Sequence, residues 1–289
     1  MKPAPFTYIR ADTAQHAVEL LKQHGDDARL LAGGQTLVPM MNLRLSRTEY
    51  LIDIGRLPLN SIEAAPGLLK VGALTRHRQL IESREAAAVA PVVPQAMWHI
   101  AHPTIRNFGT AGGSVAYADP TAEICALVVL LDGDVVTLSA AGGRAIPAPD
   151  YFISAFETAL QPDEMVVAIH LRPPAGPHGS CFLEVSERKG DYAIAAAGAV
   201  VVVNGGAIAE ARIVMSGAKS IPVRARAAEA RLKGARLTDA LVDEIGAIAV
   251  EGLDCYADIR ASAEYRKSLL MSLVSRAVGR AYDRAVSKS

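Results

Sequence analysis

Two short segments of the chain place a pair of adjacent glycines next to a hydroxyl side chain. The first, residues 31–36, reads Leu-Ala-Gly-Gly-Gln-Thr, and the second, residues 109–114, reads Gly-Thr-Ala-Gly-Gly-Ser. Because glycine has no Cβ atom, adjacent glycines adopt positive φ and let backbone N–H groups approach an anion closely. The hydroxyl can donate to a phosphate oxygen, and a helix after the first segment would add a favourable dipole. One such segment could hold one phosphate, whereas two that converge on one cleft from different lobes suit a pyrophosphate.

A glycine pair on its own is more often a tight turn than a ligand site. We interpret Gly142-Gly143 and Gly205-Gly206 of this chain as turns of that kind. The first two pairs differ in context, because a strand precedes each pair, a hydroxyl follows it, and a helix is expected downstream. From spacing alone, dinucleotide binding and a purely structural role both remain open.

Other sequence motifs with known chemistry are missing. No G-x-G-x-x-G follows a strand, and neither H-E-x-x-H nor G-x-S-x-G occurs. Residues 217–220, Gly-Ala-Lys-Ser, resemble the end of a P-loop, but alanine stands where glycine is required. His99 and His102 could share a helix face as metal ligands, yet no third ligand is near, so we interpret them as pocket or helix positions. We therefore predict no metal site, and the sequence contains none of these motifs for a catalytic base or nucleophile.

Composition argues against several classes of function. The chain has 30 lysines and arginines against 30 aspartates and glutamates, so no basic excess favours nucleic-acid binding. No apolar stretch reaches the ~18 residues needed to span a bilayer, and residues 1–10 contain no apolar signal-peptide core. Cys125, Cys181 and Cys255 lie far apart, which fits reduced thiols in the cytoplasm and no iron–sulfur or zinc site. An electron carrier would therefore be organic or belong to a partner.

The glycine segments need strands and helices to position them, and 289 residues suffice for about two domains of ~150 residues. Residues 1–55 are expected to form an α/β lobe. Its expected elements are a helix that a capping box at Asp12 and Gln15 begins and Gly25 ends, a strand over 29–32, a helix over 37–45 and a strand over 50–54.

Residues 56–175 are expected to form a second α/β lobe. Its expected elements are a strand over 68–71, a short helix that Thr75 caps before Glu82, helical turns over 86–101 interrupted by Pro91 and Pro94, a helix that Asp119 and Pro120 start, and strands over 135–138 and 165–171.

Residues 172–177, Arg-Pro-Pro-Ala-Gly-Pro, are the clearest linker, and residues 176–289 are expected to form a C-terminal domain. Its expected elements are strands over 193–203 and 207–215 joined by a hairpin turn at Asn204-Gly205, and helices over 224–233, 238–252 and 262–286. The predicted fold class is therefore α+β: two α/β lobes, then an α+β domain with a small antiparallel sheet and helices.

The glycine segments also carry a family resemblance. Residues 32–36 resemble the A-G-G-[QH]-[ST] signature of the FAD subunit of molybdenum hydroxylases, a family that includes carbon monoxide dehydrogenase, quinoline oxidoreductase and xanthine dehydrogenase. Residues 110–114 resemble its T-[ILV]-G-G-[SN] signature, with Ala111 in place of the branched aliphatic residue. Residues 119–123 (Asp-Pro-Thr-Ala-Glu) and 188–193 (Arg-Lys-Gly-Asp-Tyr-Ala) resemble the family too, so that the similarity covers nearly the whole chain.

The resemblance implies a two-lobed FAD-binding fold of the vanillyl-alcohol-oxidase/PCMH type, followed by a C-terminal domain of the carbon monoxide dehydrogenase flavoprotein type. FAD would be bound non-covalently, with its pyrophosphate between the glycine segments. Glu123 would accept a cofactor hydroxyl, and Tyr192 would lie over the isoalloxazine. The residues implied as cofactor-binding are Arg29, Leu30, Leu31, Ala32, Gly33, Gly34, Gln35, Thr36, Ile100, His102, Thr110, Ala111, Gly112, Gly113, Ser114, Asp119, Glu123, Leu160, Lys189 and Tyr192.

In this family a large subunit with molybdopterin cytosine dinucleotide hydroxylates the substrate, and [2Fe–2S] clusters of a small subunit carry the electrons to the FAD subunit. The FAD subunit passes them to an external acceptor. The resemblance therefore implies a heterotrimer, expected as a dimer of heterotrimers in the cytoplasm, without nucleic acid or a membrane span. The substrate is read elsewhere and could be an N-heteroaromatic compound, carbon monoxide or an aldehyde. Gln35, where the carbon monoxide enzymes often have histidine, favours an N-heterocycle.

Two other functions are compatible with the sequence. A self-sufficient flavin oxidase of the vanillyl-alcohol-oxidase type would bind substrate over the flavin and commonly tether FAD through His or Cys. No such residue stands in a recognisable attachment context here, and the third domain is short for a substrate cap. A non-catalytic assembly scaffold would use the glycines only as turns and would purify without flavin. Benzoyl-CoA-reducing relatives are disfavoured, because this chain lacks the cysteines of their additional iron–sulfur cluster.

Overall fold

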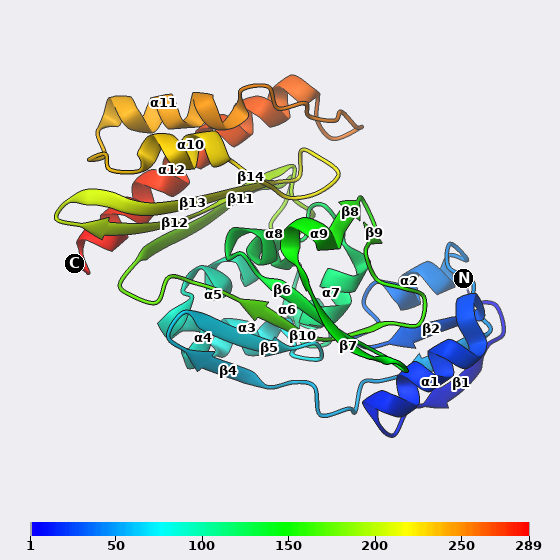
Figure 1. Ribbon diagram of the computed structural model, residues 1–289. Helices are drawn as coiled ribbons and strands as arrows, with labels where there is room; N and C mark the ends of the chain where they lie inside the picture. The colour runs from blue at the N-terminus through cyan, green and yellow to red at the C-terminus, as the bar shows by residue number, and fades with distance from the viewer. Residues whose placement is uncertain (1, 289) are drawn as a thin grey trace.

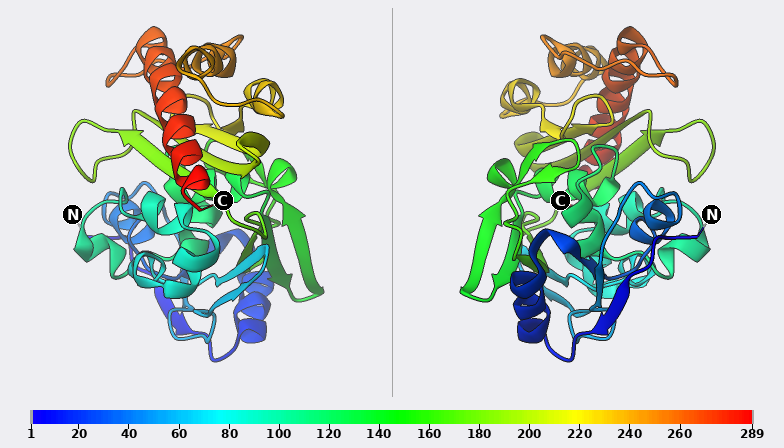
Figure 2. Two further views of the ribbon diagram at one scale, coloured as in Figure 1. Left: turned by 90° about the vertical axis from the view of Figure 1, so that its left-hand side faces the viewer. Right: turned by 90° about the vertical axis from the view of Figure 1, so that its right-hand side faces the viewer.

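The computed structural model describes residues 2–288, so residues 1 and 289, at the ends of the first and third predicted segments, lie outside it. Figure 1 shows helices at the top, a sheet beneath them, and a two-lobed body below the sheet. Figure 2 shows the same stacking from two sides, with the C-terminal helix lying across the sheet. The predicted α+β class is confirmed.

The first lobe is a small parallel sheet with one long helix against it. Its elements are β1 (Thr7–Arg10), α1 (Ala14–His24), the 3-10 turn η1 (Gly25–Asp27), β2 (Ala28–Leu31), α2 (Leu37–Asn42) and β3 (Tyr50–Asp53). The strand order is β1-β3-β2, and both pairs are parallel. Because β2 ends at Leu31, the first glycine pair follows directly from the carboxyl end of a strand, as predicted.

The second lobe is a sheet with helices on it, but its five strands pair only in antiparallel fashion, in the order β4-β5-β10-β6-β7. The helix α8 (Glu123–Leu130) is buried almost all round, since it packs against α5 (Val92–Met97) and α7 (Ala111–Tyr117) of this lobe and against strands of the C-terminal sheet. The elements are β4 (Ile62–Ala65), β5 (Leu68–Gly72), α3 (His77–Glu82), α4 (Arg84–Val89), α5 (Val92–Met97), α6 (Pro103–Arg106), α7 (Ala111–Tyr117), α8 (Glu123–Leu130), β6 (Asp134–Ser139), β7 (Gly142–Pro147), α9 (Ala148–Tyr151), β8 (Phe152–Ser154), β9 (Glu157–Thr158) and β10 (Met165–Leu171).

The C-terminal domain is an antiparallel sheet, in the order β11-β12-β13-β14, with helices on one face and the second lobe on the other. Its elements are β11 (Gly179–Val185), β12 (Ala195–Asn204), β13 (Ala207–Ser216), β14 (Val223–Arg224), α10 (Arg226–Leu232), α11 (Asp239–Val250) and α12 (Ala263–Val286). Along β12, Ala197 and Val201 belong to the core under α12, whereas Ala196 and Val200 belong to the core around α8. Burial on both faces explains why this strand reads as a continuous apolar run.

Several predicted element boundaries are wrong by one to three residues. Thr13, not Asp12, caps α1, because its hydroxyl accepts from the His16 amide at 3.0 Å. Arg76, not Thr75, caps α3, because the Thr75 hydroxyl donates instead to the Ser61 carbonyl at 3.2 Å. The helix α2 ends at Asn42, three residues before the predicted end.

Cys125, Cys181 and Cys255 are buried and free. None of the helices within residues 2–288 combines the length and the apolar character needed to cross a bilayer.

An arginine of the C-terminal domain fastens that domain to the carboxyl end of α8. The Arg224 side chain is 7% exposed, and its Nη1 lies 2.7 Å from Asp132 Oδ1 and donates to the Leu130 carbonyl at 3.4 Å. Its Nε lies 2.6 Å from Glu229 Oε1, which is also buried. A cation at a helix C-terminus is favourable, because unsatisfied carbonyls gather there. This contact fixes the C-terminal domain to the helix whose other end carries Glu123.

We therefore expect Arg224→Met to destabilise the full chain by about 3 kcal/mol, because it leaves the buried Glu229 carboxylate without its nearest cation. Urea unfolding measures the effect. The matched control is Arg231→Met, which removes an ion pair to Glu244 whose partners are both about half exposed. It should cost less than about 1 kcal/mol. Equal losses in the two variants would contradict a special role for Arg224.

Candidate functional site

The two glycine segments meet at the boundary between the first and second lobes. A Cβ atom built on Gly33 would lie 2.2 Å from the carbonyl oxygen of Phe108 and 3.0 Å from the Cα of Gly109. A Cβ on Gly113 would lie 4.0 Å from the Cβ of Ala32. The lobes therefore touch backbone to backbone at Gly33, and no residue with a side chain fits there unless the lobes separate. The structure brings the two segments together, as the sequence predicted.

The first segment leaves a row of backbone donors unused. Among residues 2–288, no hydrogen-bond acceptor faces the N–H groups of residues 33–36. Gly34 has a φ of +71°, which suits glycine. Thr36 is the N-cap of α2, yet its hydroxyl makes no capping bond. These residues are partly exposed, so that four amides and a hydroxyl are open to a ligand.

The second segment is built differently from the prediction, because its glycines lie inside the first turn of α7 rather than in a loop. Thr110 is the N-cap and accepts from the Gly113 amide at 3.2 Å. The amides of Ala111 and Gly112 donate to the carbonyls of Thr75 at 2.9 Å and Ala73 at 2.8 Å. Their amides are therefore committed to the fold, and the prediction that this segment offers free amide donors is wrong. Its accessible polar group is the Ser114 side chain.

Two residues behind the second segment carry no sequence motif. Arg76 donates to the Phe108 carbonyl and forms an isolated β-bridge with Thr110. His77 Nε2 lies 3.2 Å from Ser114 Oγ, and burial, together with the nearby charges of Arg76 and Arg106, lowers the pKa of His77 to about 4. Both follow β5 in the chain, more than 30 residues before the glycine pair. Only the pairing of this connection with Thr110 makes them part of the site, so no local pattern could have found them.

Asp119 does not start α8 as predicted. Its Oδ1 accepts from the amide and the hydroxyl of Thr121, at 2.8 and 2.6 Å, and this closes a separate turn. The helix begins three residues after the predicted Pro120, with Ala122 as its N-cap and Glu123 as its first residue.

Glu123 forms a carboxyl pair with Glu184 of β11, a residue that the sequence analysis did not single out. Burial, together with the charge of Glu184, raises the pKa of Glu123 well above its usual range, and Glu123 in its protonated form donates to Glu184. Burial raises the pKa of Glu184 to about 7 despite this bond. The other oxygen of Glu184, Oε2, is buried without a partner among the described residues. The pair therefore retains at least one proton at neutral pH.

A loop of the C-terminal domain reaches the same region. A Cβ on Gly190 would lie 2.8 Å from the Ala101 carbonyl and 3.0 Å from His102 Cε1, so this loop packs directly on the predicted residues around His102. Tyr192 is 62% exposed. Burial of part of its phenol ring, together with the nearby charge of Asp119, raises the pKa of Tyr192.

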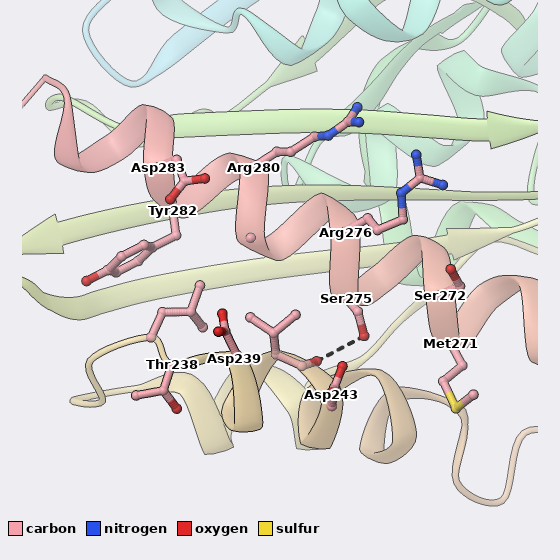
Figure 3. Close-up of a pocket in the computed structure, with 13 residues that line it drawn as sticks. Thr238, Asp239, Asp243, Met271, Ser272, Ser275, Arg276, Arg280, Tyr282 and Asp283 are labelled. Atoms are coloured by element: carbon pink, nitrogen blue, oxygen red, sulfur yellow. Dashed lines mark hydrogen bonds between the residues drawn. The ribbon is translucent and has the colours of Figure 1, made fainter.

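A cavity of about 240 Å³ lies under this loop, lined by Trp98, His99, Glu184, Ser186, Lys189 and Gly190. A larger cavity of about 830 Å³ lies elsewhere, between α11 and α12. Figure 3 shows Asp239 and Asp243 on one side of it and Ser275 donating to the Val242 carbonyl. It is remote from the glycine segments in the chain and contains none of the predicted site residues.

The remaining predicted residues lie around this framework. Ile100 and Leu160 are half-buried and pack against the core of the second lobe. Leu30 and Leu31 belong to β2. Arg29 stands at the far end of β2, and its guanidinium donates to the carbonyls of Asp26 and Ala28, at 2.8 and 2.7 Å. Its side chain is therefore committed locally, while Gln35 Nε2 donates to the Gly33 carbonyl at 3.1 Å.

Comparison with known protein families decides what this arrangement is. Residues 4–174 match the family model described as the FAD binding domain in molybdopterin dehydrogenase, and residues 180–281 match the CO dehydrogenase flavoprotein C-terminal domain. The chain belongs to this family. It is the FAD-binding medium subunit of a molybdenum hydroxylase, and so part of an oxidoreductase, as the resemblance implied.

Similar proteins span the full length of the chain. The 6-hydroxypseudooxynicotine dehydrogenase complex subunit alpha of Paenarthrobacter nicotinovorans is 39% identical over 99% of this chain and 97% of its own length. The carbon monoxide dehydrogenase medium chain of Afipia carboxidovorans is 35% identical over 99% of both. The solved structure of quinoline 2-oxidoreductase from Pseudomonas putida 86 superposes with a TM-score of 0.94 at 32% identity, over 99% of both chains. These relatives support the medium-subunit assignment and not the self-sufficient oxidase.

The residues present fit FAD. A diphosphate needs several donors on a surface without obstructing side chains, and the four unused amides beside Gly33 supply them. Phe108 and Tyr192 are exposed, so that both offer an aromatic face to a ligand. The chain therefore offers both the polar and the aromatic contacts that a flavin dinucleotide requires.

The carboxyl pair predicts a pH dependence of stability. Because folding raises the pKa of Glu184, the folded chain binds more protons than the unfolded chain between the ordinary glutamate pKa and about 7. Stability is therefore greatest below this window and is lost as pH rises through 7. In thermal unfolding of the flavin-free chain, Glu184→Gln should leave Tm nearly unchanged at pH 5 and raise it at pH 8, by roughly 2–4 °C per kcal/mol gained.

The control for this experiment is Glu187→Gln, which removes an exposed carboxylate three residues along the chain. Its Tm should follow that of the wild type at each pH. If the curves of the wild type and Glu184→Gln ran parallel from pH 5 to pH 8, Glu184 would have an ordinary pKa in the folded chain.

Proposed function

We propose that residues 33–36 and the Thr110–Ser114 segment hold the diphosphate of FAD between the first two lobes. The observation that carries the proposal is the backbone contact at Gly33, beside which four N–H groups and the Thr36 hydroxyl have no partner among residues 2–288. Amide donors arranged in this way bind anionic oxygens without any charged side chain. In this proposal the first segment makes most of the hydrogen bonds to phosphate, and Ser114 is the donor from the second segment.

Of the predicted residues, Ala111, Gly112 and Arg29 have their donors committed to the fold, so in this proposal they shape the site. The roles of the other predicted residues follow their position. Glu123 accepts a cofactor hydroxyl, and Tyr192 and Lys189 reach the isoalloxazine end from the C-terminal domain. Ile100, His102 and Leu160 line the apolar surroundings. In this proposal the chain divides at residues 55 and 175. Residues 1–55 and 56–175 are the lobes that clamp the dinucleotide, and residues 176–289 close its flavin end.

When bound, FAD supplies what no side chain here can, namely the ability to take electrons singly and to release them to an acceptor. The chain binds the dinucleotide, orients it and excludes water from its polar end. The proposed donors are [2Fe–2S] clusters on a small subunit, and the hydroxylation site is molybdopterin cytosine dinucleotide on a large subunit. The proposed assembly is a cytoplasmic dimer of such heterotrimers with an external electron acceptor.

The proposed substrate of the complex is an N-heteroaromatic compound. Among the relatives, the names of the caffeine dehydrogenase subunit beta of Pseudomonas sp. and the nicotine 6-hydroxylase medium subunit of Paenarthrobacter nicotinovorans point to such compounds. Gln35, in place of the histidine that the carbon monoxide enzymes often carry, supports the same choice. Carbon monoxide oxidation is the second candidate, on the similarity to the carbon monoxide dehydrogenase medium chains.

The composition of the purified protein tests this function. Isolated with its co-purifying chains, the protein should contain FAD, iron and molybdenum, and acid denaturation should release all of the yellow colour into solution. Flavin that stays with the denatured chain would indicate a tethered oxidase. Colourless protein from a flavin-replete host would indicate a scaffold.

A single methyl group tests the proposed site. Gly33→Ala should weaken FAD binding on the order of 100-fold, because separating the lobes loses about two hydrogen bonds to phosphate of ~1.5 kcal/mol each. Quenching of flavin fluorescence in titrations of the full chain measures the Kd. Gly176→Ala is the matched control, because a Cβ there meets nothing within 4 Å. Unchanged affinity in Gly33→Ala would place the diphosphate elsewhere.

A further inference from the structure

The buried histidine His77 contacts Ser114, the side chain of the second glycine segment that a ligand can reach. His77 is the first residue of α3 and is 3% exposed. Its ring presses on the backbone of Gly109, where a Cβ would lie 2.6 Å from Cδ2 and 2.8 Å from Nε2. Its Nε2 lies 3.2 Å from Ser114 Oγ, while its Nδ1 has no hydrogen-bond partner anywhere in residues 2–288.

The unpartnered nitrogen indicates which tautomer is present. A neutral imidazole carries one N–H and one lone pair, and the low pKa of His77 keeps it neutral at physiological pH. If Nδ1 carried the hydrogen, a buried donor would have no acceptor, which is the more costly kind of unsatisfied group. If Nε2 carries it, the N–H points at Ser114 Oγ and only a lone pair is left over. The positive charges of Arg76 and Arg106 near the ring also favour a lone pair there over a second donor.

The tautomer determines what Ser114 can do. When Nε2–H donates to Oγ, the serine oxygen is the acceptor and its own hydrogen must turn away from the ring. Ser114 is half-buried, and its neighbour Gly113 is exposed and lies close to Ala32 of the first lobe, so a ligand between the lobes can approach this hydroxyl. The serine is thereby held as a donor, which a negatively charged oxygen requires.

We propose that His77 is a positioning residue that fixes the Ser114 hydroxyl as a hydrogen-bond donor to a diphosphate oxygen of FAD. The inference rests on the proposed function, because it assumes that the diphosphate lies between the two glycine segments. His77 itself does not touch the cofactor, being buried behind α7. The imidazole of His77 also explains why residue 109 is glycine, because any side chain there would displace the ring.

A double-mutant cycle on the full chain tests the proposal, with FAD affinity measured by fluorescence quenching. His77→Phe and Ser114→Ala should each weaken FAD binding by roughly tenfold, the loss of one hydrogen bond to a charged acceptor. In the Ser114→Ala background, His77→Phe should have no further effect, because the hydroxyl that it orients is gone. Additive losses would show that His77 acts on affinity through packing alone, and would overturn the proposal.

Two conservative variants separate orientation from packing. His77→Gln places an amide donor near the position of Nε2 and should keep FAD affinity within about threefold of the wild type. His77→Asn places its donor near the position of Nδ1, out of reach of Ser114, and should weaken binding as much as His77→Phe. Equal affinities of the Gln and Asn variants would contradict the role of Nε2.

The tautomer can be measured without any substitution. Nitrogen-15 NMR of the histidine side chains distinguishes protonated from unprotonated ring nitrogens in the wild-type chain, with or without FAD. We expect the hydrogen of His77 on Nε2. A hydrogen on Nδ1 would contradict the proposal even if the variants failed to fold. If the wild type bound no FAD at all, the proposed function would be wrong. The spectrum of the flavin-free chain would still report the tautomer of His77, so the two failures can be told apart.

Discussion

The structure depends on one close approach, the contact of Gly33 with the backbone of Phe108 and Gly109. A Cβ at Gly33 would overlap a carbonyl oxygen, so the lobes can meet only where one of them has no side chain. This contact also explains the unused amides of residues 33–36. Residues 33–36 leave the sheet of the first lobe and run against the backbone of the second, so their N–H groups find no acceptor among the described residues of the first lobe. A buried or half-buried donor without an acceptor is costly. On the proposed assignment, the diphosphate satisfies them.

The rest of the fold holds the second lobe in place for that contact. Arg76 donates to the carbonyl of Phe108. The amides of Ala111 and Gly112, at the start of α7, donate to carbonyls of the connection that follows β5. The second glycine pair is therefore glycine for packing: a Cβ on Gly112 would lie 2.5 Å from the Cβ of Ala73. The two similar motifs thus do different work. One presents backbone donors, and the other lets a helix sit close enough to present a hydroxyl.

The sequence predicted the fold class, most central strands and the long helices, because their apolar patterns are strong and continuous. The strands that it missed all lie at the edges of their sheets, where pairing on one side only leaves a weaker pattern: β1, β4, β7, β8, β9, β11 and β14. Asp119 was misplaced as a helix cap because its carboxylate binds Thr121 instead, a local competition that the sequence does not decide. His77 and Glu184 could not be found, since each reaches the site from an element distant in the chain.

The helix α8 connects the domains through its two ends. Its carboxyl end is held by Arg224 of the C-terminal domain, and its first residue, Glu123, shares a proton with Glu184 of the same domain. The C-terminal domain thus sets both the position of this helix and the charge at its start. A second ionised carboxylate there would face the first at close range and would repel any anionic ligand nearby. Because at least one proton is retained, the pair carries less negative charge than two ionised glutamates would, which reduces its repulsion of an anionic ligand nearby. The proposed site therefore meets negative charge with amides and a hydroxyl, which is consistent with the lack of any lysine or arginine in either glycine segment.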